Sequence, residues 1–161
     1  MIWPFPMESI HPMVVHFPIA LLLTAVGLDL AALIAKRPAW HRVALWNLSL
    51  GTLAAGAAVW TGLRAEEAAK HTFEIHQVMM QHERLGITTL ILGVMAASYR
   101  VMRRDQLTTR GRLATLAIML AMTGTLLYGA HLGGRMVFEF GVGGTFGIGE
   151  EHSNTEPHHH D

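Results

Sequence analysis

The amino-acid sequence predicts an all-α membrane protein, an up-down bundle of four transmembrane helices with both termini on the outer side. Three observations support this. Of the 161 residues, 51% are apolar and only 15% are charged, which is unusual for a small soluble domain. The apolar residues gather in four segments close to the roughly 20 residues that cross a bilayer. The charged residues lie between these segments and differ in sign between the two sides.

The first predicted span covers residues 13–35 and contains only two titratable side chains, His16 and Asp29. Pro18 cannot donate a backbone hydrogen bond, so we expect it to bend or delay this helix near His16. The second predicted span, residues 43–63, contains no titratable side chain. It is rich in Gly and Ala, which allow helices to approach closely in lipid.

The third predicted span, residues 80–100, has an uninterrupted apolar stretch only between Arg84 and Arg100. That stretch is short for a full crossing, so the helix is expected to begin upstream of it. The fourth span, residues 113–134, is interrupted only by His131. The four spans and their short connections predict an up-down bundle.

The C-terminal part of the chain changes character after the fourth span. Residues 135–149 are apolar but too short and too glycine-rich to cross a membrane, so we expect an interfacial segment. Residues 150–161 are polar and rich in His, and are expected to be disordered. A single transmembrane domain, residues 1–144, therefore makes up almost the whole chain.

The distribution of basic residues predicts the orientation. Most of them lie between the first and second spans or between the third and fourth: Lys36, Arg37, Arg42, Arg100, Arg103, Arg104, Arg110 and Arg112. By the positive-inside rule these connections are cytoplasmic. We therefore expect a multi-pass protein of the bacterial inner membrane with periplasmic termini. The net charge is zero, so no nucleic-acid partner is expected.

The predicted topology places ten of the eleven histidines on the outer side, all except His41. His11 and His16 lie at the start of the first span, His82 lies on the approach to the third, and His131 lies at the end of the fourth. Ionisable residues within a membrane usually face the bundle interior and mark functional sites. The alternative is that each imidazole is hydrated or bonded to a nearby carbonyl.

Histidines on facing helices of a bundle are suited to holding haem iron, and they also bind copper, zinc or non-haem iron. The absence of Cys excludes thiolate metal sites and covalent haem attachment. Gly86 lies one turn beyond His82 and leaves a groove that suits a flat ligand. Close helix packing is the alternative explanation for this glycine.

Asp29 is the one acidic residue inside a predicted span. It lies near the cytoplasmic end, on the opposite side from most histidines. We expect it to pair with an arginine of a loop, such as Arg42 or Arg112, rather than to relay protons.

Three motifs resemble the DUF2231 family of bacterial membrane proteins. They are HPMVVHFPIALL at residues 11–22, the TGL of residues 61–63 followed by His82, and HLGGRMVFEFGVG at residues 131–143. The resemblance implies a four-span inner-membrane protein. Domains of this family sometimes occur joined to Rieske or cytochrome c modules, which implies electron transfer and a haem b held by histidines. The matching positions are His11, His16, His82 and His131.

The leading hypothesis is a b-type cytochrome with one haem, or two, near the periplasmic face. It would move electrons between the quinone pool and a periplasmic redox protein or larger respiratory complex, and is not expected to be a stand-alone enzyme. His16 and His82 are the favoured axial ligands, with His131 and His11 as alternatives or a second pair. Other hypotheses are a protein that binds or transports copper, zinc or iron through these histidines and a structural subunit of a larger membrane complex. Formation of a homodimer is a further hypothesis, because a small bundle with glycine-rich faces tends to find a partner.

Overall fold

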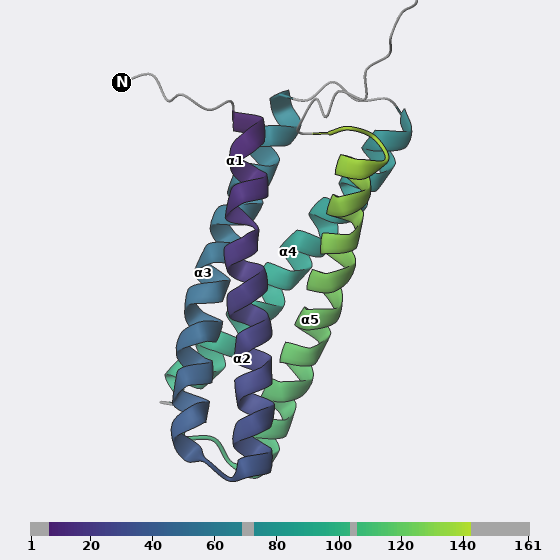
Figure 1. The fold of residues 1–161 in the computed structure, drawn as a ribbon. Helices are drawn as coiled ribbons and strands as arrows, with labels where there is room; N and C mark the ends of the chain where they lie inside the picture. The colour runs from purple at the N-terminus through teal and green to yellow at the C-terminus, as the bar shows by residue number, and fades with distance from the viewer. Residues whose placement is uncertain (1–6, 69–72, 104–105, 143–161) are drawn as a thin grey trace, which may run out of the picture.

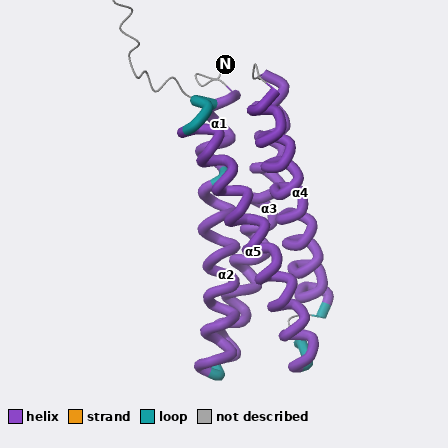
Figure 2. The backbone as a smooth tube through the Cα atoms, turned by 90° about the vertical axis from the view of Figure 1, so that its right-hand side faces the viewer, coloured by secondary structure: helices purple, strands orange, loops and turns teal. Residues whose placement is uncertain are grey.

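The computed structural model describes residues 7–68, 73–103 and 106–142. Within these residues the regular structure is entirely helical, as Figures 1 and 2 show. The helices are α1 (Met7–Val14), α2 (His16–Ala35), α3 (Pro38–Ala68), α4 (Phe73–Met102) and α5 (Thr109–Phe138). The predicted all-α architecture is confirmed.

The long helices form a four-helix bundle in which consecutive helices run in opposite directions (Figure 1). α2 packs mainly against α3, and α4 packs mainly against α5. Contacts of α3 with α4 and of α2 with α5 close the ring, so α2 and α4 lie diagonally opposite. α1 continues the line of α2 and packs against α3. We call the end that carries His11, His82 and His131 the histidine end, and the end that carries Arg100 and Arg112 the arginine end.

The described residues contain four helices that are long and apolar enough to cross a membrane: Ile10–Ala35, Pro38–Glu66, Phe73–Met102 and Thr109–Phe138. Large apolar side chains cover the outside of the bundle, among them Phe17, Ile34 and Leu53, which is 72% exposed. Such a surface is unfavourable in water and favourable in lipid. The four predicted spans are thus found as four helices.

The helices extend beyond the apolar stretches that located them. α4 begins at Phe73, upstream of the predicted span, and α5 continues to Phe138 through the first residues of the segment expected at the interface. A helix satisfies its own backbone groups, so it can continue past the hydrocarbon region with polar side chains. Residues 143–149 of the expected interfacial segment and the tail, residues 150–161, lie outside the described residues.

The first span is interrupted once, between α1 and α2. Val15 separates the two helices, and the amide of Ile19 bonds to the Val15 carbonyl at 3.3 Å. Pro18 has no N–H to offer the carbonyl of Val14, one turn before it, so the helical hydrogen-bond pattern is broken here. The disturbance expected near His16 is therefore present.

Local signals mark the helix ends. Lys36 ends α2 in a left-handed conformation, with φ at 51°, and Pro38 occupies the first position of α3, where its fixed φ is favourable. The hydroxyl of Thr108 accepts a hydrogen bond from the Gly111 amide at 3.2 Å and caps α5. At the other end of α5, the hydrogen bond from Arg135 holds the pKa of the Glu139 carboxyl below its usual range.

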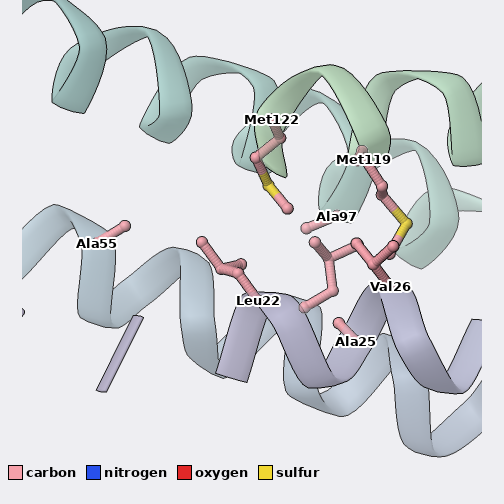
Figure 3. Close-up of a cluster of buried hydrophobic side chains, with 9 residues drawn as sticks. Leu22, Ala25, Val26, Ala55, Ala97, Met119 and Met122 are labelled. Carbon is pink, nitrogen blue, oxygen red and sulfur yellow. The ribbon is translucent and has the colours of Figure 1, made fainter. Parts of the chain in front are cut away.

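The centre of the bundle is filled mainly by small residues and methionines (Figure 3). The buried cluster consists of Leu22, Ala25, Val26, Leu48, Ala55, Ala96, Ala97, Met119 and Met122. Helices approach closely where glycines face larger side chains. A Cβ atom at Gly51 would lie 2.8 Å from Leu22, and one at Gly93 would lie 2.9 Å from Thr52.

A buried charge cluster lies at the arginine end. The Asp29 carboxylate accepts hydrogen bonds from His41 Nδ1 at 2.7 Å and from Arg100 at 3.1 Å. Arg100 is only 1% exposed and also donates to the His41 carbonyl at 2.8 Å. The sequence analysis proposed Arg42 or Arg112 as partners of Asp29 and did not identify His41 and Arg100. Both belong to long helices, whose register relative to α2 the sequence does not reveal.

Candidate functional site

His11 is held at the histidine end by contacts with α3. Its Nδ1 lies 3.0 Å from the carbonyl oxygen of Ala58 and 3.3 Å from the hydroxyl of Thr61. The Thr61 hydroxyl itself donates to the Ala57 or Ala58 carbonyl, so it is free to accept from the imidazole. The His11 ring is half-buried and is oriented by the backbone of a neighbouring helix.

His82 has an equivalent environment on the other side of the bundle. Its Nδ1 lies 2.8 Å from the carbonyl oxygen of Gly129 in α5. A Cβ atom added at Gly133 would lie 3.3 Å from the Cε1 atom of His82. Likewise, a Cβ atom at Gly62 would lie 3.0 Å from Cε1 of His11. Each imidazole therefore packs against a glycine that leaves room for it.

The two hydrogen bonds determine the tautomer of both rings. A carbonyl oxygen only accepts hydrogen bonds, so Nδ1 of His11 and Nδ1 of His82 must each carry the proton. In the neutral ring, Nε2 then has a free lone pair and is the atom that can bind a metal. Donation of the other ring N–H to a backbone carbonyl is a common way in which proteins orient metal-binding histidines.

His11 and His82 face one another across the bundle. Their ring centroids are 6.1 Å apart, and the ring planes are nearly perpendicular, at 85°. The rings come from α1 and α4, which belong to the first and third spans. The sequence analysis favoured His16 and His82 from these two spans, whereas the rings that lie together in the structure are those of His11 and His82.

A cavity of about 590 Å³ surrounds the two histidines. This volume lies within the range of roughly 300–1,000 Å³ that is typical of small-molecule sites. Apolar side chains of α2, α3, α4 and α5 form most of its wall, and His16, Glu66 and Glu83 add polar groups. The site is therefore an apolar pocket with two oriented imidazoles.

A family model described as a predicted membrane protein, DUF2231, matches residues 7–145. The chain belongs to the DUF2231 family. The match includes all the described helices and therefore both His11 and His82. The family resemblance of the three sequence motifs is thus confirmed. No curated protein and no solved structure matches this chain.

In this DUF2231 protein His16 lines the same cavity, but its side chain is exposed. His11 belongs to α1, and His16 is the first residue of α2, on the other side of the break at Val15. The favoured ligand pair of the sequence analysis was His16 and His82. The ring that lies beside His82 in the structure is that of His11.

His131 faces away from the cavity. It is exposed, stacks on Tyr128 with ring centroids 6.3 Å apart, and is not one of the residues that line the pocket. Two positions along a helix correspond to a rotation of about 200°. Since Gly129 and Gly133 both face His82, the residue midway between them points to the opposite side of α5.

Gly86 lies in the cavity wall, at the position where the sequence analysis expected a groove. A Cβ atom there would meet only Val59, at 3.8 Å, which is an ordinary contact. Gly93, further along α4, has a different role, because Thr52 and Met122 pack directly against it. Of these two glycines, Gly86 borders the pocket and Gly93 belongs to the helix packing.

The sequence analysis did not identify the groups that orient the imidazoles. Two of these are backbone carbonyls, which leave no signature in a sequence. Gly62 and Gly133, however, are part of the TGL and HLGG motifs that carried the family resemblance. The glycines of these motifs were the available signal, because a residue without a side chain often marks a close approach of another group.

Proposed function

We propose that this protein is a membrane b-type cytochrome in which His11 and His82 are the axial ligands of one haem. The observation that carries the proposal is the pair of facing imidazoles, each with Nδ1 bonded to a backbone carbonyl and Nε2 available. Paired imidazoles from different helices of a bundle are an established means of holding haem iron.

The spacing of the rings supports this proposal. A metal held by two imidazole nitrogens at about 2 Å each places the ring centroids roughly 6 Å apart. The observed separation is 6.1 Å. Gly62 and Gly133 leave space for the rings, and Gly86 leaves space in the wall for a flat molecule.

The donor set favours haem over a bare metal ion. A structural zinc site needs four protein ligands and a catalytic one needs three. Among the described residues no group of three or more His, Cys, Asp and Glu side chains is arranged to hold a metal ion. Haem needs only two axial groups from the protein, because the porphyrin supplies the other four nitrogens. Two histidines are sufficient for haem and insufficient for a closed zinc site.

Bound haem would supply a one-electron carrier near one face of the membrane. His11 and His82 would hold it, and the apolar wall would limit the access of water. The excess of basic residues at the arginine end supports a cytoplasmic position for that end. The site would then face the periplasm of the bacterial inner membrane. We infer that it exchanges electrons between the quinone pool and a periplasmic redox protein or a larger respiratory complex.

The test is an optical spectrum of the detergent-purified protein, expressed with ample haem, before and after reduction by dithionite. We expect the sharp reduced bands of six-coordinate haem b and one haem per chain. His11→Gln and His82→Gln should each remove most of the six-coordinate signal, because glutamine keeps a polar side chain but is a poor iron ligand.

His131→Gln is the matched control and should leave the spectrum unchanged, because His131 points away from the cavity. His16→Gln distinguishes the two possible partners of His82. A featureless spectrum would exclude the proposal. Metal analysis of the same sample would then separate a copper or zinc protein from a structural subunit.

A further inference from the structure

The environments of His11 and His82 correspond position by position. His82 stands 71 positions after His11, and the carbonyl of Gly129 stands 71 positions after that of Ala58. The glycines that make room for the rings, Gly62 and Gly133, are separated by the same interval. Three independent parts of the site thus repeat with one offset.

The helix starts and the buried faces repeat with the same offset. α3 begins at Pro38 and α5 begins at Thr109. Five buried positions of α2 have a buried counterpart in α4: Pro18 and Thr89, Leu22 and Gly93, Ala25 and Ala96, Val26 and Ala97, and Asp29 and Arg100. The two helices therefore bury the same face.

The second helix of each hairpin follows the same rule. Buried positions of α3 correspond to buried positions of α5: Ala44 and Thr115, Leu48 and Met119, Gly51 and Met122, Ala58 and Gly129, and Thr61 and Leu132. Few of these pairs are identical residues, so the repeat is evident in the burial pattern and hardly visible in the sequence.

At one contact that occurs in both halves, the large residue and the glycine have changed places. In the first hairpin, Leu22 of α2 packs on Gly51 of α3. In the second, Met122 of α5 packs on Gly93 of α4. The large residue and the glycine have exchanged helices, while the contact between equivalent positions is retained.

Two contacts define the relation between the halves. His11 faces His82, and Asp29 binds Arg100. In each case a residue meets its own counterpart 71 positions away. In a structure with two-fold symmetry, a residue can meet its own copy only at the symmetry axis. The axis therefore passes through the candidate site at the histidine end and through the charge cluster at the arginine end.

We propose that the bundle consists of two copies of one helical hairpin, related by a two-fold pseudosymmetry axis along the bundle, and that the candidate site is a two-fold site on this axis. Parallel repeats of this kind occur in other membrane proteins. Each copy contributes one imidazole, one orienting carbonyl and one glycine. If the proposed haem function holds, the ligand is one with two equivalent faces, and Gly62 and Gly133 are matched positioning residues.

The charge cluster is where the two copies differ most. Identical copies would place two aspartates or two arginines together on the axis, and like charges buried together are strongly unfavourable. Asp29 and Arg100 are opposite in charge, and His41, which binds Asp29, has Arg112 as its equivalent 71 positions later. The opposite charges therefore favour the docking of one hairpin on the other at the arginine end.

An exchange of charges between the halves tests the pseudosymmetry without reference to haem. Asp29→Arg and Arg100→Asp alone each leave like charges buried, and each should lower the midpoint of thermal unfolding in detergent by roughly 10 °C or more. The fourfold exchange variant combines both changes with His41→Arg and Arg112→His. It should recover at least half of this loss, because the carboxylate placed at position 100 regains an arginine across the axis, at position 29, and a histidine within its own hairpin, at position 112.

Glu139→Arg, at the exposed ion pair with Arg135, is the control for a change of charge alone and should have little effect. Recovery in the fourfold variant supports the equivalence of the two halves, whether or not the protein binds haem. An exchange variant as unstable as the single variants would overturn the pseudosymmetry. Absence of haem from the wild-type protein would instead overturn only the proposed function.

Discussion

At the scale of single residues, the backbone determines which imidazole nitrogen is available. Nδ1 of His11 donates to the Ala58 carbonyl and Nδ1 of His82 to the Gly129 carbonyl, which leaves the Nε2 lone pair free on both rings. The same contacts fix the ring planes nearly at right angles, at 85°. The orientation of the rings is thus built into the helices before any ligand is bound.

The perpendicular planes lead to a spectroscopic prediction. For a ferric haem with two imidazole ligands, perpendicular planes give a strongly anisotropic low-spin signal in electron paramagnetic resonance, and parallel planes give an ordinary rhombic one. We expect the anisotropic signal from the oxidised wild-type protein at low temperature. A rhombic signal would show that the ligand planes are not those of His11 and His82 in this structure.

The glycine beside His82 provides a second prediction at this scale. A Cβ atom at Gly133 would lie 3.3 Å from the imidazole, whereas one at Gly124, on the same helix but not in the cavity wall, would have nothing within 4 Å. Gly133→Ala should therefore displace the ring and reduce haem occupancy severalfold. Gly124→Ala should keep full occupancy and stabilise the helix slightly, by about 1 kcal/mol or less. Occupancy is measured by the ratio of Soret to protein absorbance, and equal values in the two variants would contradict this role of Gly133.

The sequence identified His82 and His11 as candidates but did not select His11 over His16. His11 precedes the first predicted span and His16 lies near its start. The choice between them depends on which face of α1 packs on α3. The carbonyl partners are 47 residues away from each imidazole. Contacts at this separation depend on helix register, which hydrophobic pattern alone does not specify.

At the scale of helices, close packing depends on glycines placed opposite larger side chains. A Cβ atom at Gly51 would lie 2.8 Å from Leu22, whose neighbour Leu21 is also in contact. We expect Gly51→Ala to lower the free energy of unfolding by about 1–3 kcal/mol. Gly56→Ala is the matched control on the same helix, because its Cβ atom would meet only Leu90 at 3.9 Å. Thermal unfolding in detergent measures both, and an equal loss in the two variants would contradict the packing account.

The positions of the helices were predictable and their ends and partners were not. Apolar stretches locate the part of a helix that crosses the hydrocarbon, but α4 begins at Phe73 and α5 ends at Phe138, beyond those stretches. For the same reason Arg100 was assigned to a loop, although it lies inside α4 and is buried against Asp29. The sequence alone does not show whether a charged side chain near the end of a span faces the interior of the bundle or its surroundings.

At the scale of the whole molecule, the up-down order of the helices places the first and third spans diagonally across the bundle. This arrangement brings His11 and His82 together at one end and Asp29 and Arg100 at the other. Topology was predictable from four apolar segments with short connections. The repeat of one hairpin was not, because it is carried by burial and contacts rather than by residue identity.

The proposed orientation can be tested with single cysteines, since the chain has none of its own. Gln77 is exposed at the histidine end and Arg37 is exposed at the arginine end. A maleimide that cannot cross membranes, added to spheroplasts, should label Gln77→Cys directly. Arg37→Cys should be labelled only after permeabilisation. The reverse pattern would place the histidine end in the cytoplasm and would exclude a periplasmic redox partner.

The central claim is that one haem is held between His11 and His82, and the most direct measurement is a titration of haemin into the haem-free protein in lipid nanodiscs. We predict saturation at one haem per chain with a six-coordinate low-spin spectrum, and loss of this binding in the His11→Gln/His82→Gln double variant. Wild-type protein that gives no six-coordinate species, or a double variant that binds haemin as the wild type does, would contradict the claim.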